Sequence, residues 1–403
     1  MSDLITKEII KKFAVSGPRY TSYPTAPQWQ PIEQSIYETA LTEFNSNPTS
    51  ISLYFHIPFC QTMCYYCGCN VKIRRHNGDT GMIYVEYLIK EMALINKDIK
   101  MKPHVKQLHF GGGTPNFLSP EQLQVLWDGI QQYYILDENC EIAIEIDPRT
   151  ITDEFLWKLK ELGFNRLSMG IQDFNPQVQQ SINRVQPYEE VSTLMQKLKS
   201  LDLTSINMDL IYGLPFQTWN NFENTIDKIN ELSPDRIALY SYAHVPWLKS
   251  HQSLIKESDL PSAEEKLSIF LNSRNKLQEN GYQAIAMDHF AKKEDELAVS
   301  FKNRTLYRNF MGYTTKPAEA FIGIGVTSIG FISHHFIQNT SDLKKYYEKL
   351  DLNELPVNKG LALSEDDIIR QFVIQELMCH GILNFKGFEK KFGYDFIEYF
   401  KDE

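Results

Sequence analysis

The stretch ISLYFHIPFCQTMCYYCGC, residues 51–69, joins a strand-length apolar run to a loop that holds four of the chain's six cysteines. Within this loop, Cys60, Cys64 and Cys67 have the spacing CxxxCxxC. Three thiolates on one short loop can hold three corners of an iron–sulfur cube, whereas ferredoxin-type clusters usually take four. One iron would then keep an open position where chemistry can occur. We therefore expect a cluster-binding loop directly after the first strand.

A structural zinc site is the main alternative for these cysteines. Zinc sites favour two separated CxxC-like pairs, often with a histidine pair. Here the remaining cysteines, Cys140 and Cys379, stand alone, and the first histidine after the loop is His76. Disulfides are not expected, because the chain shows no signal-peptide pattern. Cys140 and Cys379 lie in apolar runs, and we expect both to be buried as small hydrophobic residues.

Composition places the chain among ordinary globular proteins. Its 403 residues are 42% hydrophobic and 23% charged, and its net charge of -10 disfavours a nucleic-acid partner. No apolar run reaches the roughly 18 residues that a membrane span needs, so we expect a cytoplasmic protein without a membrane partner. No heptad pattern or long apolar stripe indicates an oligomer, and we expect a monomer.

Short apolar runs alternate with helix-like segments from residue 51 onward. The runs are strand-length and rich in branched or aromatic side chains. They span residues 51–57, 105–110, 141–147, 165–172, 205–213 and 236–243. Such alternation predicts an α/β fold with a parallel sheet. Six units favour a partial (β/α)6 barrel, with a doubly wound sheet as the alternative.

The pattern divides the chain into three regions. Residues 1–50 form an N-terminal arm, whose segment SGPRYTSYPTAPQW we expect to pack on the barrel. Residues 51–245 form the barrel, and residues 246–403 form a barrel extension and a smaller, mostly helical C-terminal domain. Helices are expected there around 262–280, 341–351 and 364–380. In either fold, the functional site is expected at the C-terminal ends of the strands.

Glycines and charged residues follow the strand ends. The second strand runs into Gly111–Gly113, where glycine allows close backbone approach. Glu145 ends the third strand and could accept a hydrogen bond from an ammonium group or a ribose hydroxyl. Asp209 lies inside the apolar run MDLIYG, which is costly unless the carboxylate is paired, and Arg184 is a possible partner.

Other polar residues near the strand ends leave two interpretations open. Asp147 and Arg149 fit an ion pair at least as well as a functional role. Tyr54 and His56 lie on the first strand just before the cysteine loop, where packing with a satisfied polar tip is as good an interpretation as ligand contact.

The cysteine and glycine loops resemble those of the radical S-adenosylmethionine (SAM) enzymes. Further motifs extend the likeness over nearly the whole chain, which resembles the family of oxygen-independent coproporphyrinogen III dehydrogenases, also called oxidases. These motifs are HIPFCQTMCYYCGCN, LHFGGGTP, EIDPRT, GFNRLSMGIQDFN, INMDLIYGLPFQT, MDHFA and RNFMGYTT. The SGPRYTSYPTA arm, the CGC cysteine Cys69 and RNFMGYTT are the most specific parts. Met311 stands where the family commonly has glutamine, and the family pattern normally continues beyond residue 403.

This resemblance implies one 4Fe-4S cluster, held by Cys60, Cys64 and Cys67, and two SAM molecules. The SAM that chelates the cluster is expected to contact Tyr54, Gly112, Glu145 and Ile329. The second SAM is expected to contact Tyr66, Gly68, Gly113, Thr114, Gln172, Arg184, Asp209 and Ala243.

The implied reaction uses a 5′-deoxyadenosyl radical to convert the propionates on rings A and B of coproporphyrinogen III into vinyl groups, giving protoporphyrinogen IX. The implied partners are the porphyrinogen substrate and an electron donor such as a flavodoxin or a ferredoxin. The acidic substrate would need cationic contacts, for which Arg19, Arg304 and Arg308 are candidates.

Three other classes stay open at this point. They are a haem chaperone or haem-utilisation relative in the same superfamily, a non-catalytic haem- or iron-binding protein, and a zinc-stabilised structural module. The haem-handling relatives usually lack the CGC cysteine and the TSYPTA arm. Both are present in this chain, which favours the dehydrogenase.

Overall fold

The computed structural model describes residues 12, 22–46, 48–75, 78–97, 99–203 and 205–403. The predicted arm is therefore described only from residue 22, and Arg19 lies outside the described residues. Among the residues described, no helix is both long and apolar enough to cross a membrane.

Each of the predicted apolar runs forms a strand, and these strands are parallel neighbours in chain order. They are β2 (Ile51–Ile57), β5 (His104–Gly112), β6 (Ile135–Ile146), β7 (Arg166–Gln172), β8 (Ser205–Tyr212) and β9 (Arg236–Ser241). In a doubly wound sheet the strand order reverses at a switch point, and no such reversal occurs between β2 and β9. The prediction of a partial (β/α)6 barrel is therefore confirmed.

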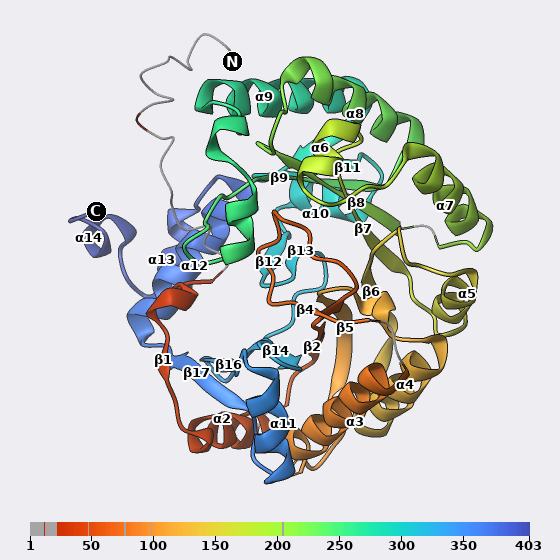
Figure 1. The fold of residues 1–403 in the computed structure, drawn as a ribbon. Helices are drawn as coiled ribbons and strands as arrows, with labels where there is room; N and C mark the ends of the chain where they lie inside the picture. Colours follow the sequence, from red (N-terminus) through yellow and green to blue (C-terminus); the bar gives the residue numbers. More distant parts are fainter. Residues whose placement is uncertain (1–11, 13–21, 47, 76–77, 98, 204) are drawn as a thin grey trace.

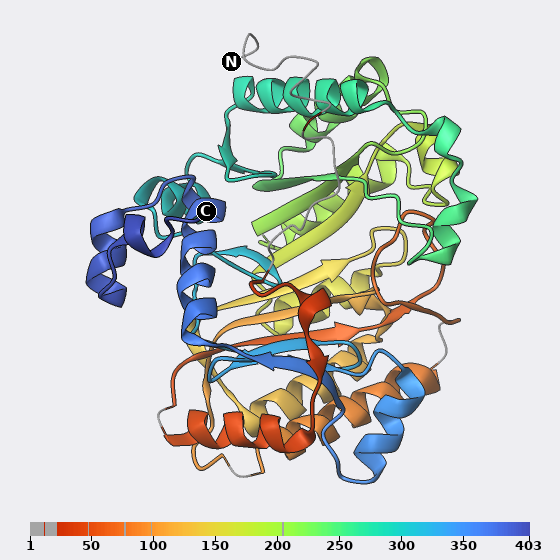
Figure 2. The ribbon, with the colours of Figure 1, turned by 90° about the vertical axis from the view of Figure 1, so that its left-hand side faces the viewer.

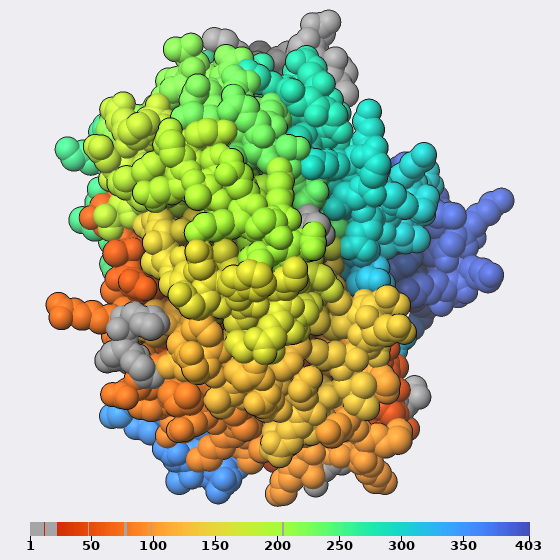
Figure 3. All heavy atoms as spheres, turned by 90° about the vertical axis from the view of Figure 1, so that its right-hand side faces the viewer, coloured from red at the N-terminus to blue at the C-terminus, as the bar shows by residue number. Residues whose placement is uncertain are grey.

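Helices cover the outer face of this curved sheet (Figure 1). They are α3 (Gly78–Ile95), α4 (Pro120–Tyr133), α5 (Asp153–Glu161), α7 (Tyr188–Ser200) and α8 (Trp219–Leu232), whereas α6 (Pro176–Ser181) lies at the strand ends beside the cysteine loop. Figure 3 shows them from outside as a continuous layer whose colours follow the chain order from orange to green. With both faces covered, β2 buries every residue except the half-buried Tyr54, as expected for a central parallel strand.

Capping residues predicted from the sequence define the start of α4 and both ends of α5. The Ser119 side chain accepts a hydrogen bond from the Gln122 amide, and the Gln122 side chain accepts one from the Ser119 amide, which forms a capping box before α4. Thr152 caps α5 in a similar way. Gly163 follows this helix with a φ of 81°, a conformation that favours glycine.

The N-terminal arm packs on the edge of the sheet. It contains η2 (Ala26–Gln28), β1 (Gln30–Pro31) and α2 (Gln34–Ser46). Strand β1 pairs with β17 (Val357–Ala362). The buried ring of Trp29 stacks on Phe336 at a centroid distance of 4.9 Å. The described part of the arm thus lies against the C-terminal strands.

Residues 246–403 are mostly helical, as predicted, and they also extend the barrel sheet. Their helices are η4 (Ser250–Leu254), η5 (Glu257–Asp259), α9 (Ala263–Glu279), α10 (Glu296–Asn303), α11 (Leu343–Asp351), α12 (Glu365–His380), α13 (Phe385–Phe392) and α14 (Phe396–Tyr399). Strands β14 (Ala320–Ile324), β15 (Ile329–Ile332) and β16 (His335–Asn339) continue from β2 to β17, with β14 parallel to β2. Strands β11 (His289–Lys292) and β10 (Tyr282–Ile285) continue from β9 at the other edge, and β12 (Tyr307–Asn309) pairs with β13 (Gly312–Thr314).

Candidate active site

A cavity of about 450 Å³ opens where the parallel strands end. The cysteine loop follows β2, the glycine loop follows β5, and the ends of β6, β7, β8 and β9 complete the wall. All but two of the predicted site residues line it. They are Cys60, Cys64, Tyr66, Cys67, Gly68, Gly112, Gly113, Thr114, Glu145, Gln172, Arg184, Asp209 and Ala243.

The two exceptions, Tyr54 and Ile329, lie on either side of Gly323 of β14 and do not line this cavity. Tyr54 pairs in register with Gly323 of β14. A Cβ atom on Gly323 would lie 2.1 Å from the Ile329 carbonyl oxygen, so the strands meet closely here. The Tyr54 hydroxyl lies 3.1 Å from His56 Nδ1, and His56 Nε2 lies 3.2 Å from the Asn70 carbonyl oxygen. These contacts satisfy the polar tips of Tyr54 and His56.

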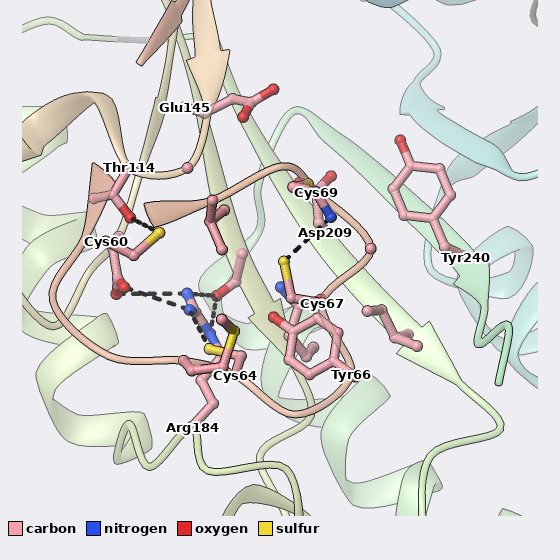
Figure 4. A pocket seen from close by; sticks show the side chains of 18 of the residues that line it. Cys60, Cys64, Tyr66, Cys67, Cys69, Thr114, Glu145, Arg184, Asp209 and Tyr240 are labelled. Atoms are coloured by element: carbon pink, nitrogen blue, oxygen red, sulfur yellow. Dashed lines mark hydrogen bonds and ion pairs between the residues drawn. The ribbon is translucent and has the colours of Figure 1, made fainter. Parts of the chain in front are cut away.

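The cysteine loop turns its sulfur atoms toward one space (Figure 4). Cys60 Sγ lies 3.3 Å from Thr114 Oγ1 of the glycine loop. The Cys69 amide donates to Cys67 Sγ over 3.4 Å. A 3₁₀ turn, η3 (Pro115–Phe117), follows Thr114 and leads into α4. The loop is thus tied to the neighbouring strand end on the side of its first cysteine.

A second segment, residues 249–252, contacts backbone carbonyls of the cysteine loop. Lys249 Nζ donates to the Cys69 carbonyl over 3.1 Å, and Gln252 Nε2 donates to the Tyr66 carbonyl over 2.9 Å. His251 Nε2 lies 2.8 Å from the Cys67 carbonyl oxygen. Sequence reasoning did not find these three residues, since they lie some 180 positions from the loop and no motif marks them.

The thiols differ in their readiness to ionise. Hydrogen bonds from the side chain and amide of Cys69, together with the charges of His251 and Lys249, lower the pKa of Cys67 to about 6. Burial raises the pKa of Cys60 to about 11, although a hydrogen bond from Thr114 acts in the opposite direction. Thiolates are the metal-binding form of cysteine, so Cys67 is closer than Cys60 to the form that could bind a metal.

The donor set fits an iron–sulfur cube better than a single ion. In the part of the chain that the structure describes, no three His, Cys, Asp or Glu side chains are grouped to hold one metal ion. A zinc ion needs all its sulfur ligands within about 2.3 Å of one point. In a cube each cysteine binds a different iron, so Cys60, Cys64 and Cys67 need only surround a common space, as they do (Figure 4).

Arg184 pairs with Asp147 and not with Asp209, so the predicted Arg184–Asp209 pair is wrong. Asp147 Oδ2 lies 2.6 Å from Arg149 Nη2 and 3.4 Å from Arg184 Nη1. Both guanidinium groups also lie 3.7 Å from Cys64 Sγ. The Asp147–Arg149 ion pair that the sequence allowed is confirmed, and it joins a buried cluster beside the second cysteine.

Asp209 is satisfied by neutral partners instead. Its carboxylate accepts hydrogen bonds from Ser168 Oγ at 3.2 Å and from Asn207 Nδ2 at 2.7 Å. Burial and the charge of Glu145 raise the pKa of Asp209 to about 6. Ser168 lies on the neighbouring strand β7, and its contact with Asp209 follows from the sheet order that only the fold defines.

Glu145 reaches across to the glycine loop. Its carboxylate accepts a hydrogen bond from the Gly112 amide at 3.1 Å and lies 3.2 Å from His109 Nε2. Burial raises the pKa of Glu145, but these two contacts outweigh it and leave the pKa below its usual value. The ionised carboxylate is 43% exposed and can accept a further hydrogen bond from a ligand.

Close backbone approach explains the glycines. A Cβ atom on Gly113 would lie 2.8 Å from the Pro58 carbonyl carbon and 2.9 Å from the Phe59 carbonyl oxygen. Gly112 has a φ of 113°, and a Cβ there would lie 2.6 Å from the His56 ring. A larger residue at either position would push the glycine loop away from the cysteine loop.

Of the arginines predicted to bind substrate, the two that the structure describes, Arg304 and Arg308, do not line this cavity. Arg304 is exposed at the end of α10. Arg308 lines a separate cavity of about 190 Å³ and lies 5.2 Å from the ring centroid of Tyr313. Met311, the position that departs from the family pattern, lines a small polar space inside the barrel. Roles for these residues stay predictions.

Strand-end residues that sequence reasoning overlooked also line the cavity. Gly170 lies on β7, while Tyr240, Ser241 and Tyr242 lie at the end of β9. The predicted strand ends alone could have identified them, because the carboxyl ends of parallel strands meet at one edge.

Comparison with known proteins decides the family. The model of the Radical SAM superfamily matches residues 54–229. The oxygen-independent coproporphyrinogen III oxidase of Synechocystis sp. is 44% identical over 401 residues, covering 98% of this chain and 86% of that protein. The chain belongs to the family of oxygen-independent coproporphyrinogen III oxidases. It is a radical SAM enzyme.

Further members of this oxidase family agree. The oxygen-independent coproporphyrinogen III oxidase of Escherichia coli K12 is 41% identical over 398 residues, which cover 98% of this chain and 86% of that protein. The solved structure of coproporphyrinogen III oxidase from Escherichia coli, described as a radical SAM enzyme, superimposes with a TM-score of 0.91 at 39% identity, covering 95% of this chain and 88% of that one. Membership in this oxidase family removes the zinc-module and non-catalytic alternatives.

Proposed function

We propose that this protein oxidatively decarboxylates the propionates on rings A and B of coproporphyrinogen III, yielding protoporphyrinogen IX in haem biosynthesis. One observation carries the proposal: the CxxxCxxC cysteines, the glycine loop and the Glu145 carboxylate line one cavity at the strand ends. The 44% identity to an oxygen-independent coproporphyrinogen III oxidase over 98% of this chain supports the substrate assignment.

We propose that the residues around the cavity hold one 4Fe-4S cluster and two SAM molecules. Cys60, Cys64 and Cys67 would each hold one iron of the cluster, leaving the fourth for a chelating ligand. Glu145 and Gly112 would bind the ammonium and carboxylate groups of the chelating SAM, and Tyr54 and Ile329 would add further contacts to it. The second SAM would lie against Tyr66, Gly68, Gly113, Thr114, Gln172, Arg184, Asp209 and Ala243.

Two of these residues are prepared to bind a ligand. Gln172 is 7% exposed and has a φ of 66°. Its Oε1 atom has no hydrogen-bond partner within the part of the chain described, although it is buried. Buried polar atoms without a partner are costly, so a donor on a bound ligand would stabilise this position. Asp209, held by Ser168 and Asn207, can accept a hydrogen bond from a ribose hydroxyl.

When bound, the cluster and SAM supply a 5′-deoxyadenosyl radical that takes one hydrogen atom from the β-carbon of a propionate. The propionate carboxylate would then leave as carbon dioxide and one electron would pass to a one-electron acceptor, which leaves the vinyl group. The chain's part is placement: the loops fix the reacting carbons beside each other and keep water away from them. Asp147 holds Arg149 and Arg184 beside Cys64, which fixes the cavity wall.

The test is an anaerobic incubation of reconstituted protein with coproporphyrinogen III, SAM and a reductant. Products are oxidised to porphyrins and separated by chromatography. We expect protoporphyrin and an intermediate with one vinyl group, together with 5′-deoxyadenosine. Three variants should lose the cluster and form neither vinyl porphyrins nor 5′-deoxyadenosine: Cys60→Ala, Cys64→Ala and Cys67→Ala. The control Cys140→Ala, at a buried cysteine far from the loop in sequence, should keep the cluster and form all of these products.

Deoxyadenosine without a vinyl product would leave the radical SAM assignment in place and remove the substrate. Iron and sulfide retained equally by the three cysteine variants would refute the cluster site. We further propose that the protein acts as a monomer and that a flavodoxin- or ferredoxin-like carrier reduces its cluster.

A further inference from the structure

The segment 245–254 lies between the cysteine loop and the protein surface. Its Lys249, His251 and Gln252 side chains contact backbone carbonyls of the loop, as described above. Val245 is tied to the same segment, since its amide donates to Gln252 Oε1 over 2.6 Å. Figure 2 shows the segment, which contains η4, beside the cysteine loop at the right-hand edge of the molecule. The segment at this edge therefore contacts the backbone of the loop that carries the cysteines.

The same segment exposes large apolar side chains. Trp247 is 73% exposed, Leu248 72% and Leu254 60%. Val245 and Gln252 line the cavity, whereas these three are not among the described residues that line it. Substrate or SAM bound in the cavity would therefore not cover them. Neighbouring exposed apolar residues mark interaction surfaces, and tryptophan is enriched where protein interfaces gain most of their energy.

A basic strip flanks the other side of the loop. Strand β4 (Lys72–Ile73) pairs in parallel with β3 (Phe59–Cys60), and the Arg74 amide donates to the Cys60 carbonyl over 2.9 Å. Arg74 and Arg75 are both exposed. Three cations, Lys72, Arg74 and Arg75, thus follow the cluster-binding loop directly in sequence and in space.

The start of α11 adds two more cations to this strip. Asn70 Nδ2 donates to the Ser341 carbonyl over 3.1 Å, which brings the exposed Lys344 and Lys345 onto the same face. The acidic groups here are Asp342 and Glu348, whose Oε1 lies 3.6 Å from Lys344 Nζ. The Lys345 amide, together with the charges of Lys345 and Lys72, holds the pKa of Asp342 below its usual value. The strip is therefore positive on a chain whose net charge is -10.

We infer that this electron-entry face, made of Lys72, Arg74, Arg75, Lys344, Lys345, Trp247 and Leu248, docks an acidic protein that carries one electron at low potential. Positive side chains on one side of the loop and exposed apolar side chains on the other match an acidic partner with an apolar rim near its redox group. The face surrounds the outer side of the one loop that we propose to hold the cluster, which is where an electron must enter. The inference therefore rests on the proposed function.

The step on this face is a simple transfer. The carrier, for example the hydroquinone form of a flavodoxin, gives up one electron and becomes the semiquinone. The oxidised cluster gains that electron, and the protein forms and breaks no bond. The carrier then dissociates, so the contact should be weak, rapid and sensitive to salt.

The test uses the reconstituted full-length protein and flavodoxin hydroquinone in anaerobic stopped flow, following cluster bleaching. The variants are R74E/R75E and W247A. The matched control is K386E/K390E on α13, which changes the net charge equally and lies on the opposite side in Figure 2. Reduction of each protein by dithionite, a small reductant that needs no docking, reports whether the cluster is intact.

At low salt we expect the second-order rate constant for flavodoxin to fall at least ~10-fold in R74E/R75E, because charged rims mainly set association rates. The W247A rate should fall roughly 5-fold. High salt should remove the charge effect but not the tryptophan effect. Dithionite should reduce all variants at the wild-type rate.

Three results would overturn the inference. They are flavodoxin rates within about 2-fold of wild type in both R74E/R75E and W247A, an equal fall in the control, and a W247A variant that changes only the KM for coproporphyrinogen III. A wild-type protein that assembles no cluster, so that dithionite bleaches nothing, would instead refute the proposed function itself. Reduction by dithionite therefore distinguishes failure of the docking inference from failure of the proposed function.

Discussion

Replacing Asp147 with asparagine tests the buried ion cluster beside Cys64. The carboxylate is 9% exposed and contacts Arg149 at 2.6 Å and Arg184 at 3.4 Å. The amide of asparagine would leave two guanidinium groups close together without their shared counter-charge. Removing one partner of a buried ion pair costs about 3–5 kcal/mol. We therefore expect Asp147→Asn to lower the free energy of unfolding by that amount at pH 7.

The pKa of Asp147 gives a second measure of the same interaction. Burial raises it, but the charges of Arg184 and Arg149 dominate and lower it to about 2, against a usual value of 3.8. At about 1.4 kcal/mol for each pH unit, this difference stabilises the fold by roughly 2.5 kcal/mol. Because the pKa of Asp147 is depressed in the folded state, this stabilisation is present above about pH 4 and is lost as the pH falls toward 2. At pH 3 about half of it is lost.

The assay is urea unfolding of the metal-free protein, followed by fluorescence and circular dichroism at pH 7 and at pH 3. At pH 7 the free energy of unfolding of Asp147→Asn should be well below that of the wild type. At pH 3 the difference between the two free energies should be smaller. Asp351→Asn is the control, because that exposed carboxylate contacts Lys90 and Tyr87 at the surface, and its unfolding midpoint should not move. A loss below about 1 kcal/mol for Asp147→Asn, or a gap that does not depend on pH, would refute the reasoning.

Two further substitutions test the site, and a third tests Glu91, a buried carboxylate of α3 that accepts a hydrogen bond from the Tyr346 hydroxyl at 2.6 Å. Gly113→Ala places a Cβ 2.9 Å from the Phe59 carbonyl oxygen, so SAM binding measured by calorimetry should weaken at least ~10-fold while the far-ultraviolet dichroism stays native; unchanged affinity would exclude a tight loop contact. Glu145→Gln leaves a poorer acceptor for the Gly112 amide and for a ligand ammonium, and should weaken SAM binding by roughly 10-fold without a change in melting temperature. Burial raises the pKa of Glu91 to about 7, so wild-type stability should fall by about 3 kcal/mol as the pH rises from 4.5 to 7. Glu91→Gln should remove the share of this slope that Glu91 causes and leave the share of Asp209, whose pKa is raised to about 6, in urea titrations at several pH values. A slope identical to that of the wild type would place the titrating group elsewhere.

The sequence by itself determined the order of the strands and the place of the site. Apolar runs of strand length between helical segments define βα units, and a parallel sheet must bring the strand ends to one edge. Local side chains such as Ser119 set the helix ends through hydrogen bonds within a few residues. The spacing of Cys60, Cys64 and Cys67 is equally local, since one short loop carries all three.

Only the tertiary structure decided which charges meet across the site. Arg184 and Asp209 were plausible partners in the sequence, yet Arg184 reaches Asp147 at the end of β6, while Asp209 is satisfied by Ser168 on the neighbouring strand. Lys249 likewise meets the Cys69 carbonyl over 180 positions of chain. Such contacts depend on strand register and loop paths, which many distant residues fix together. No local pattern therefore encodes them, whereas the thiolate spacing and the strand periods can be read directly from neighbouring residues.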